Sequence, residues 1–352
     1  MNGRERVTDL PHVDFSADFS ANGIPPDYIE TAAAFIAEDD PAQRFIIPEL
    51  MPHSVLLLIH GEPRARKSLF AFELALASAT GTPAFGLERF TPPEPVVVLY
   101  VMEEDPRALT RVRMRAIVKE RCGAACPDTL HVAVRRGVNL DDPAWIDQLI
   151  TDLKRLGAKL LVLDAARRLS AKTDEGPAKV RELTRALRRI VTMADVTIAI
   201  VHHDVKPPQN GQDQRRRSQR ASGGDWFAAC ECPVHVEKIG ARESLVFPED
   251  YKFGSDPVPF TLALEVRDGL VVRLHGTDTT TEHAETAGAS GKLLAWLKAN
   301  PYSSKTAMKK AGFGWEAVET HLNALLKAGK IDGGPGRKAG STVYFVIEEP
   351  SS

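Results

Sequence analysis

From residue 53 onward, short apolar runs rich in β-branched residues alternate with longer segments whose apolar residues recur at helical spacing. The runs are SVLLLIH at 54–60, PVVVLYVM at 95–102, LHVAV at 130–134, AKLLVLD at 158–164 and VTIAIVHH at 196–203. Continuous apolar strands of this kind are buried on both faces, as in a parallel sheet covered by helices. We therefore predict an α/β fold with a mostly parallel sheet. Four later runs, VHVEKI, ESLVF, PFTLALEV and LVVRL, are predicted to extend this sheet antiparallel.

Changes in composition along the chain divide it into four parts. Residues 1–43 are mixed and polar and are interpreted as an N-terminal arm, followed by the α/β domain at 44–275. Residues 276–290, GTDTTTEHAETAGAS, contain no large apolar side chain and are interpreted as a linker. Residues 291–349 have three short helical segments and a Gly-rich hairpin, a pattern typical of a small α+β winged helix-turn-helix domain.

The overall charge and the cysteines exclude several classes of protein. Charged residues make up 26% of the chain and the net charge is -2, so nucleic-acid contacts need local basic patches. The four cysteines lack zinc-finger spacing, which favours free thiols in a reducing compartment. The first residues lack the apolar core of a secretory signal, and no window approaches the ~20 apolar residues of a membrane span. We expect a soluble cytoplasmic protein without a membrane partner.

The segment GEPRARKS at 61–68 lies between an apolar run and a predicted helix. Gly61, Lys67 and Ser68 stand in the frame G-x-x-x-x-G-K-[ST], in which backbone N–H groups surround a phosphate, lysine reaches its oxygens and serine binds Mg²⁺. Arg66 occupies the place of the second glycine, where a side chain hinders close approach of the backbone. A chance match in a turn is the alternative. The residues predicted to bind nucleotide are Gly61, Glu62, Pro63, Arg64, Ala65, Arg66, Lys67, Ser68 and Leu69.

Two predicted strands end in carboxylates. Asp164 ends AKLLVLD, the position from which a carboxylate and Ser68 together hold Mg²⁺ in phosphoryl-transfer sites, although a strand that ends in Asp is common. The acidic stretch 103–105 follows PVVVLYVM, at the strand end where open α/β sheets bind ligands. One of its carboxylates is a candidate to polarise the attacking water, and a solvated acidic turn is the alternative.

A third strand ends in His202 and His203. Adjacent strand residues face opposite sides of a sheet, so the two rings are not expected to bind one metal ion. We predict instead that one histidine senses the terminal phosphate while its neighbour packs. Three polar strand ends beside a phosphate-type loop are a more specific signal than any of them alone.

The segments GEPRARKS, VVVLYVMEED, LLVLDAARRLS, IAIVHHDVKP and QRASGGDWFAA resemble, in this order and spacing, the RecA-type ATPases of the RepA helicase group, relatives of the DnaB replicative helicases. The resemblance covers about residues 40–275. It implies ATP and Mg²⁺ as cofactors, with Ser68 and Asp164 at the metal. It also implies catalytic roles for Glu104 as base, for Lys67 on the phosphates and for His202 in coupling nucleotide state to DNA.

The chain departs from the family pattern at several positions. Arg64 and Arg66 replace family glycines, Ala165 replaces the usual proline, and Ala221 replaces the glycine of an R-G-S segment. These departures leave hydrolysis open, although arginine also binds phosphate through two hydrogen bonds. The resemblance further implies a homo-oligomer, a hexameric ring, in which a basic finger reaches the neighbour's ATP. Lys252 and Arg242 are the candidates for this finger, and a solvated surface charge is the alternative for each.

Two basic segments are candidates for DNA binding. Arg215, Arg216, Arg217 and Arg220 lie in QDQRRRSQRAS, and clustered arginines suit a single-stranded phosphate backbone. A solvated basic loop is the alternative. In the C-terminal module, Lys309 and Lys310 are predicted DNA contacts, while protein docking is the alternative role of the module.

Together these features predict an ATP-dependent, helicase- or translocase-like ring ATPase acting on DNA in replication or mobile-element maintenance. The rival hypothesis is a nucleotide- or DNA-binding regulator or assembly factor that does not hydrolyse ATP and has a degenerate loop. A recombinase-like mediator is a third possibility.

Overall fold

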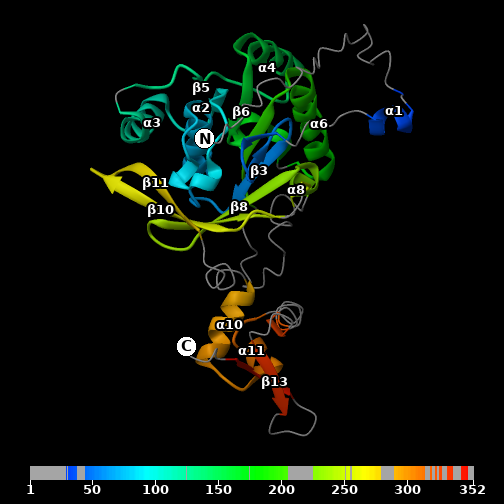
Figure 1. Ribbon diagram of the computed structural model, residues 1–352, viewed down its shortest axis with the longest axis vertical. Helices are drawn as coiled ribbons and strands as arrows, with labels where there is room; N and C mark the ends of the chain where they lie inside the picture. Colours follow the sequence, from blue (N-terminus) through cyan, green and yellow to red (C-terminus); the bar gives the residue numbers. More distant parts are fainter. Residues whose placement is uncertain are drawn as a thin grey trace, which may run out of the picture.

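The structure is a computed structural model that describes residues 29, 31–37, 44–123, 125–173, 175–204, 225–249, 251–253, 256–278, 289–313, 318, 322, 325–326, 331–335 and 342–347. Its largest feature is a nine-stranded sheet with helices on both faces (Figure 1). The strand order is β11-β10-β9-β8-β3-β7-β6-β4-β5. The strands are β3 (Leu56–Gly61), β4 (Val97–Met102), β5 (Leu130–Val134), β6 (Ala158–Asp164), β7 (Thr197–His203), β8 (Cys232–Lys238), β9 (Glu243–Pro248), β10 (Phe260–Arg267) and β11 (Leu270–Asp278).

The strands from β5 to β8 along this order run parallel, which confirms the predicted α/β fold with a mostly parallel sheet. β9, β10 and β11 add to it antiparallel, as expected from the later apolar runs. The prediction was wrong for β8, which pairs parallel with β3. A long connection that includes helix α8 (Asp225–Ala229) separates β7 from β8, and connections of this length permit a parallel neighbour.

Helices cover the sheet in two groups, and each group encloses its own apolar core (Figure 1). α2 (Lys67–Thr80) and α3 (Arg107–Cys122) cover one face, through residues such as Phe70 and Ile117. α4 (Pro143–Leu156), α6 (Pro177–Ala194) and α8 cover the other, where Trp226 is fully buried. The short elements of the core are β1 (Phe45–Ile47), β2 (Met51–Pro52), η1 (Ala84–Gly86), η2 (Glu88–Phe90), α5 (Ala166–Leu169) and η3 (Ala171–Thr173), with α1 (Ala32–Ala37) before them.

The C-terminal part has a separate apolar core and is drawn apart from the large sheet in Figure 1. It contains α10 (Ala289–Ala299), β12 (Ser303–Ser304), α11 (Lys305–Lys310), β13 (Ile331–Pro335) and β14 (Thr342–Val346). The strands form an antiparallel sheet in the order β12-β14-β13. Its buried residues include Leu293, Leu297, Met308, Val318, Leu322, Ile331 and Tyr344. Most of residues 314–331, the third of the predicted helical segments, lies outside the described residues, so the winged helix stays a prediction.

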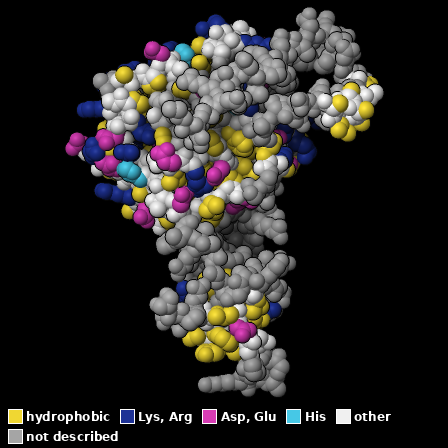
Figure 2. Space-filling model, in the orientation of Figure 1, with side chains coloured by type: hydrophobic (Ala, Val, Ile, Leu, Met, Phe, Trp, Pro, Cys, Tyr) yellow, Lys and Arg dark blue, Asp and Glu magenta, His cyan; other side chains and the backbone are white. Residues whose placement is uncertain are grey.

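The surface carries both signs of charge. Figure 2 shows Lys and Arg side chains interspersed with Asp and Glu on the visible face of the large domain. This distribution agrees with the net charge of -2 for the whole chain. Among the described residues, no helix combines the length and the hydropathy that a membrane crossing requires.

Candidate nucleotide site

The loop between β3 and α2 begins at Gly61, where the backbone of β8 comes very close. Gly61 has a φ of 152°, and a Cβ there would stand 2.2 Å from the carbonyl oxygen of Val236, so only glycine fits. Arg64 and Arg66 also have left-handed φ angles, of 67° and 74°. Both arginines therefore adopt a backbone conformation that glycine takes more easily, at a cost of about 1 kcal/mol each.

Lys67 and Ser68 open α2 and face the carboxyl ends of the strands. The Lys67 side chain is buried, and its Nζ donates to the carbonyl oxygens of Gly61 at 2.9 Å and Glu62 at 2.8 Å. The Ser68 hydroxyl donates to Oδ1 of Asp164 at 3.0 Å. No side chain caps the first turn of α2, which leaves its N–H groups available to an anion. The fold thus brings Ser68, the neighbour of Lys67, into contact with Asp164, which lies 96 residues later in the chain.

Asp164 is fully enclosed at the end of β6. Its Oδ2 accepts a hydrogen bond from the hydroxyl of Tyr100 on β4 at 2.8 Å. Burial raises the pKa of Asp164 to about 6, although the hydrogen bonds from Tyr100 and Ser68 work in the opposite direction. Burial lowers the pKa of Lys67 to about 8. The charges of both groups therefore respond strongly to a bound cation or phosphate.

The two glutamates after β4 point to different places. Glu103 is buried, and its Oε1 accepts hydrogen bonds from the backbone N–H groups of residues 136–138 at 2.8, 3.0 and 3.2 Å. Glu104 faces the loop, with its Oε2 3.7 Å from Nε2 of His203. The interaction with His203 lowers the pKa of Glu104, so this side chain is a carboxylate at neutral pH. Asp105 forms an ion pair with Arg113 on α3.

His202 and His203 lie on opposite faces of β7, as strand geometry requires. His203 lines the cavity over the loop, whereas His202 is 2% exposed and packs against Trp226, with ring centroids 5.3 Å apart. Burial lowers the pKa of His202 to about 3, so the ring stays neutral. The sequence interpretation gave the sensing role to His202. In the structure, His203 is the histidine beside Glu104, because His202 shares its face with Ile198 and Ile200 in the core.

A cavity of about 450 Å³ opens over the loop and the strand ends. Its lining includes the polar residues Arg64, Arg66, Lys67, Ser68, Glu104, Asp105, Arg113 and His203, and the apolar residues Leu69, Phe72, Met102, Met114, Ile117, Leu270 and Val271. Of the remaining loop residues predicted to bind nucleotide, Gly61 and Ala65 are buried, and Glu62 and Pro63 are exposed. The cavity thus offers both charged and apolar side chains to a ligand.

The two arginines of the loop behave differently. Arg64 is exposed and has no hydrogen bond among the described residues. The Arg66 guanidinium instead binds the turn between β8 and β9. It donates to the carbonyl oxygens of Gly240, Ala241 and Glu243 at 3.0, 2.5 and 2.6 Å, and to the hydroxyl of Ser244 at 2.8 Å. Arg66 is therefore occupied by the protein itself and fastens the loop to this turn.

The candidate finger residues lie on the antiparallel side of the sheet. Arg242 is exposed in the turn that Arg66 holds. Lys252 is exposed after β9, and its Nζ lies 3.6 Å from Oε1 of Glu231. Both are therefore on the surface, and their role as fingers stays a prediction.

The predicted DNA contacts fall in two parts of the chain. Arg215, Arg216, Arg217 and Arg220 lie outside the described residues. Lys309 and Lys310 are exposed in the last turn of α11.

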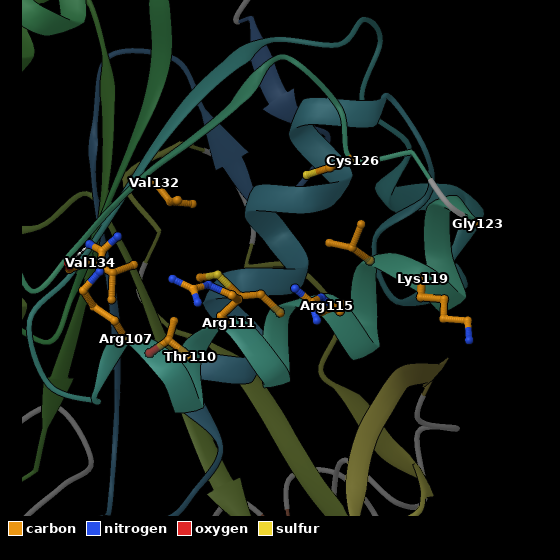
Figure 3. Close-up of a pocket in the computed structure, with 11 residues that line it drawn as sticks. Arg107, Thr110, Arg111, Arg115, Lys119, Gly123, Cys126, Val132 and Val134 are labelled. Carbon is orange, nitrogen blue, oxygen red and sulfur yellow. Dashed lines mark hydrogen bonds between the residues drawn. The ribbon is translucent and has the colours of Figure 1, made fainter.

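A larger cavity, of about 760 Å³, lies away from the loop between α3 and the edge strand β5 (Figure 3). Figure 3 shows Arg107, Arg111, Arg115 and Lys119 along α3, with Val132 and Val134 contributed by β5. Size alone does not identify the phosphate site. The smaller cavity contains Lys67, Ser68 and Glu104, which are the groups that phosphoryl transfer requires.

Comparison with known families supplies the family of this domain. The model of the family AAA_25, described as an AAA domain, matches residues 25–209, which is just over half of the 352 residues. The chain belongs to this family. AAA_25 domains are RecA-like P-loop ATPases and generally use ATP and Mg²⁺, so the nucleotide-binding ATPase core expected from the sequence is confirmed at that level.

A search among curated proteins found no match. Among solved structures, the crystal structure of the RadB recombinase is similar to this chain, with 13% sequence identity and a TM-score of 0.43. The similarity covers 60% of this chain and 88% of the recombinase chain. At this level the likeness carries no functional argument.

Sequence reasoning missed three features of the site. Tyr100 was counted only as a strand residue, although its hydroxyl holds Asp164. Arg66 was considered as a phosphate ligand, and nothing in the sequence indicates its contacts with a turn about 175 residues away. For His203 the sequence gives part of the answer. Strand alternation predicts that only one of the two adjacent histidines faces α2, but the continuous apolar pattern of β7 does not show which one.

Proposed function

We propose that this AAA_25 protein is an ATP-hydrolysing ring motor that acts on DNA as a helicase or translocase of the RepA type. The observation that carries the proposal is that Lys67, Ser68 and Glu104 line one cavity and that Ser68 is hydrogen-bonded to the buried Asp164. In a loop that no longer binds nucleotide, nothing would maintain all four of these groups together. The roles of these residues, the ring and the DNA are parts of the proposal.

In the proposed mechanism, Lys67 exchanges its bonds to two backbone carbonyls for bonds to the β- and γ-phosphate oxygens. Ser68 and Asp164, now joined by a hydrogen bond, would hold Mg²⁺ between them, and the ion would neutralise phosphate charge. The apolar side chains that line the cavity suit the base of the nucleotide.

Glu104 is the proposed general base. Its lowered pKa keeps it ionised, so it accepts a proton from the water that attacks the γ-phosphorus, and ADP leaves. His203 lies 3.7 Å from this carboxylate and is the proposed sensor of the γ-phosphate, in place of His202. Arg64 is a proposed additional phosphate contact, because its exposed side chain lines the cavity.

The proposed organisation follows the composition of the chain. Residues 1–43 form an arm, 44–275 the motor, 276–290 a linker and 291–349 a winged-helix module. Arg242, or alternatively Lys252, would reach the ATP of a neighbouring subunit in a hexameric ring. Because Arg66 holds the turn that carries Arg242, the phosphate loop and this finger candidate are mechanically joined.

The DNA contacts proposed are Arg215, Arg216, Arg217 and Arg220 on single-stranded DNA, with Lys309 and Lys310 on the C-terminal module. Clustered cations without base-reading groups give binding that depends on salt and little on sequence.

The decisive experiment measures ATP turnover of the full chain with and without single-stranded DNA. We expect DNA to stimulate turnover, and Glu104→Gln to reduce it at least ~100-fold while Mg²⁺-ATP binding is retained. Asp152→Asn is the control, since this carboxylate on α4 pairs with Arg155 and does not line the cavity, and it should change turnover less than about threefold. Mass photometry with and without ATP tests the ring. Nucleotide binding without turnover on any nucleic acid would overturn the motor and support the regulator hypothesis.

A further inference from the structure

Three histidines stand in register across neighbouring strands, directly behind the phosphate loop. His60 on β3 is the partner of His202 on β7 and of His235 on β8. Partners in adjacent strands point to the same face, so the rings lie in a row on the face opposite α2. All three are buried, with exposures of 0%, 2% and 2%. Histidine rings buried at the end of an apolar sheet need polar partners, because an unpaired polar group is costly to bury.

Asp204, immediately after β7, lies against two of these rings. Its Oδ1 is 2.9 Å from Nδ1 of His60, and its Oδ2 is 3.5 Å from Nε2 of His235. Burial opposes ionisation, but the interactions with His235 and His60 hold the pKa of Asp204 below its usual range. The group is therefore a buried carboxylate in contact with two imidazoles.

A hydrogen bond joins His60 to Asp204, between Nδ1 of the ring and Oδ1 of the carboxylate at 2.9 Å. Nδ1 is therefore the His60 nitrogen that is available to an ion shared with Asp204. The other nitrogen, Nε2, is inaccessible to solvent and has no hydrogen-bond partner among the described residues. The Phe227 ring of α8 packs perpendicular to the His60 ring, with centroids 6.2 Å apart.

We propose that His60, Asp204 and His235 bind a divalent transition-metal ion, with Zn²⁺ the best fit. Each residue offers one ligand atom, and these three atoms lie within 4.8 Å of one another. Tetrahedral Zn²⁺ with bonds of about 2.0–2.1 Å places its ligand atoms about 3.3 Å apart. The observed separations, 2.9 Å from Oδ1 of Asp204 to His60 and 3.5 Å from Oδ2 of Asp204 to His235, involve the two different carboxylate oxygens, and each is within a few tenths of an ångström of that value. Two imidazoles and one carboxylate form a ligand set that Zn²⁺ commonly uses.

This site differs in place and chemistry from the proposed magnesium site. Ser68 and Asp164 offer oxygen atoms on the α2 face, which suits a hard cation. The histidine site offers two nitrogens on the α8 face, which Mg²⁺ binds poorly. The two are linked through the backbone, because the N–H of Asp204 donates to the carbonyl of Gly61 at 3.0 Å, and Lys67 donates to the same oxygen at 2.9 Å.

The test uses the full chain, stripped with a chelator and kept in excess Mg²⁺ so that the oxygen-ligand site is saturated. Zn²⁺ is titrated in competition with a chromophoric chelator, and bound metal is counted by mass spectrometry after desalting. We expect one equivalent to bind and to raise the melting temperature. Co²⁺ in place of Zn²⁺ should give visible absorption bands typical of a tetrahedral nitrogen and oxygen site.

His60→Gln and His235→Gln should each weaken Zn²⁺ binding at least ~10-fold. The matched control is His275→Gln, because His275 is half-exposed on β11, where its ring pairs with Glu265. It should bind Zn²⁺ like the unaltered chain. Near-UV circular dichroism checks that the variants fold, and the Co²⁺ spectrum of the unaltered chain does not depend on them.

Two results would overturn the proposal. One is the absence of a stoichiometric Zn²⁺ or Co²⁺ site in the stripped, folded protein, which would leave a hydrogen-bonded His–Asp–His cluster. The other is a site of unchanged affinity in both the His60→Gln and His235→Gln variants, which would place the ion elsewhere. Neither result depends on ATP turnover, so the proposal stands or fails separately from the proposed motor.

Discussion

The two faces of the sheet differ most at the carboxyl ends of its central strands. On the α2 face, Lys67, Glu104 and His203 line a cavity that is open to ligands. On the α8 face, His60 and His202 are buried under Trp226 and its helix. β7 supplies one histidine to each face. Because His202 and His203 are the same residue type, the difference in their burial decides their roles. His202 is neutral and enclosed, which fits a role in packing. His203 is partly exposed and lies next to a carboxylate, which fits a role in catalysis.

The largest expected effect comes from truncating the two histidines separately. His202→Ala removes a buried ring and should lower the free energy of unfolding by about 2–4 kcal/mol. His203→Ala should change that free energy by less than about 0.5 kcal/mol, because its side chain is only partly covered, while ATP turnover falls at least ~10-fold. Denaturant unfolding and turnover per folded molecule measure both quantities. Equal losses of stability in the two variants would remove the distinction between the faces.

The two loop arginines offer a second, smaller contrast. Arg66→Ala loses four hydrogen bonds to the β8–β9 turn and keeps the left-handed backbone, so it should cost about 2 kcal/mol of stability. Arg64→Ala should leave stability unchanged and weaken ATP binding several-fold, as expected of a lost phosphate contact. Thermal unfolding with and without Mg²⁺-ATP distinguishes the two. A larger ligand effect for Arg66→Ala would place its side chain on the nucleotide after all.

The α2 face should also respond to alkaline pH. Bound phosphates favour charged Lys67, whereas in the empty site its pKa is lowered to about 8. ATP affinity should therefore be constant below about pH 7.5 and fall roughly tenfold per pH unit above 8, since each deprotonated lysine must regain its proton to bind. Binding titrations at constant ionic strength test this. In Lys67→Arg the decline should disappear, because guanidinium stays protonated throughout this range.

The smallest predicted effect concerns the hydrogen bond that the Tyr100 hydroxyl donates to Asp164. Tyr100→Phe removes the hydroxyl that donates to Oδ2 and leaves the packing of the ring in place. The loss of about 1 kcal/mol should weaken Mg²⁺-dependent nucleotide binding about fivefold and leave Mg²⁺-independent binding unchanged. Fluorescent nucleotide titrations over a range of Mg²⁺ concentrations separate the two. An equal loss with and without Mg²⁺ would contradict a role through Asp164.

The sequence was sufficient for the sheet and for the groups of the cavity because both follow from local rules. Continuous apolar runs predicted the parallel strands, and strand ends predicted that Asp164 and Glu104 would meet Lys67 at one edge. Contacts between distant segments carry no such local pattern. Only the folded chain shows that Arg66 donates hydrogen bonds to the 240–244 turn and that His60 and His235 are partners in adjacent strands.

The bond between Arg66 and the β8–β9 turn has an evolutionary consequence. A glycine at position 66 would leave the turn free to vary in length and composition, whereas an arginine that binds three of its carbonyl oxygens fixes the backbone path. Position 66 and residues 240–244 should therefore change together among relatives of this chain. Relatives with a glycine at this position would lack this shared constraint, and their turns would be free to diversify.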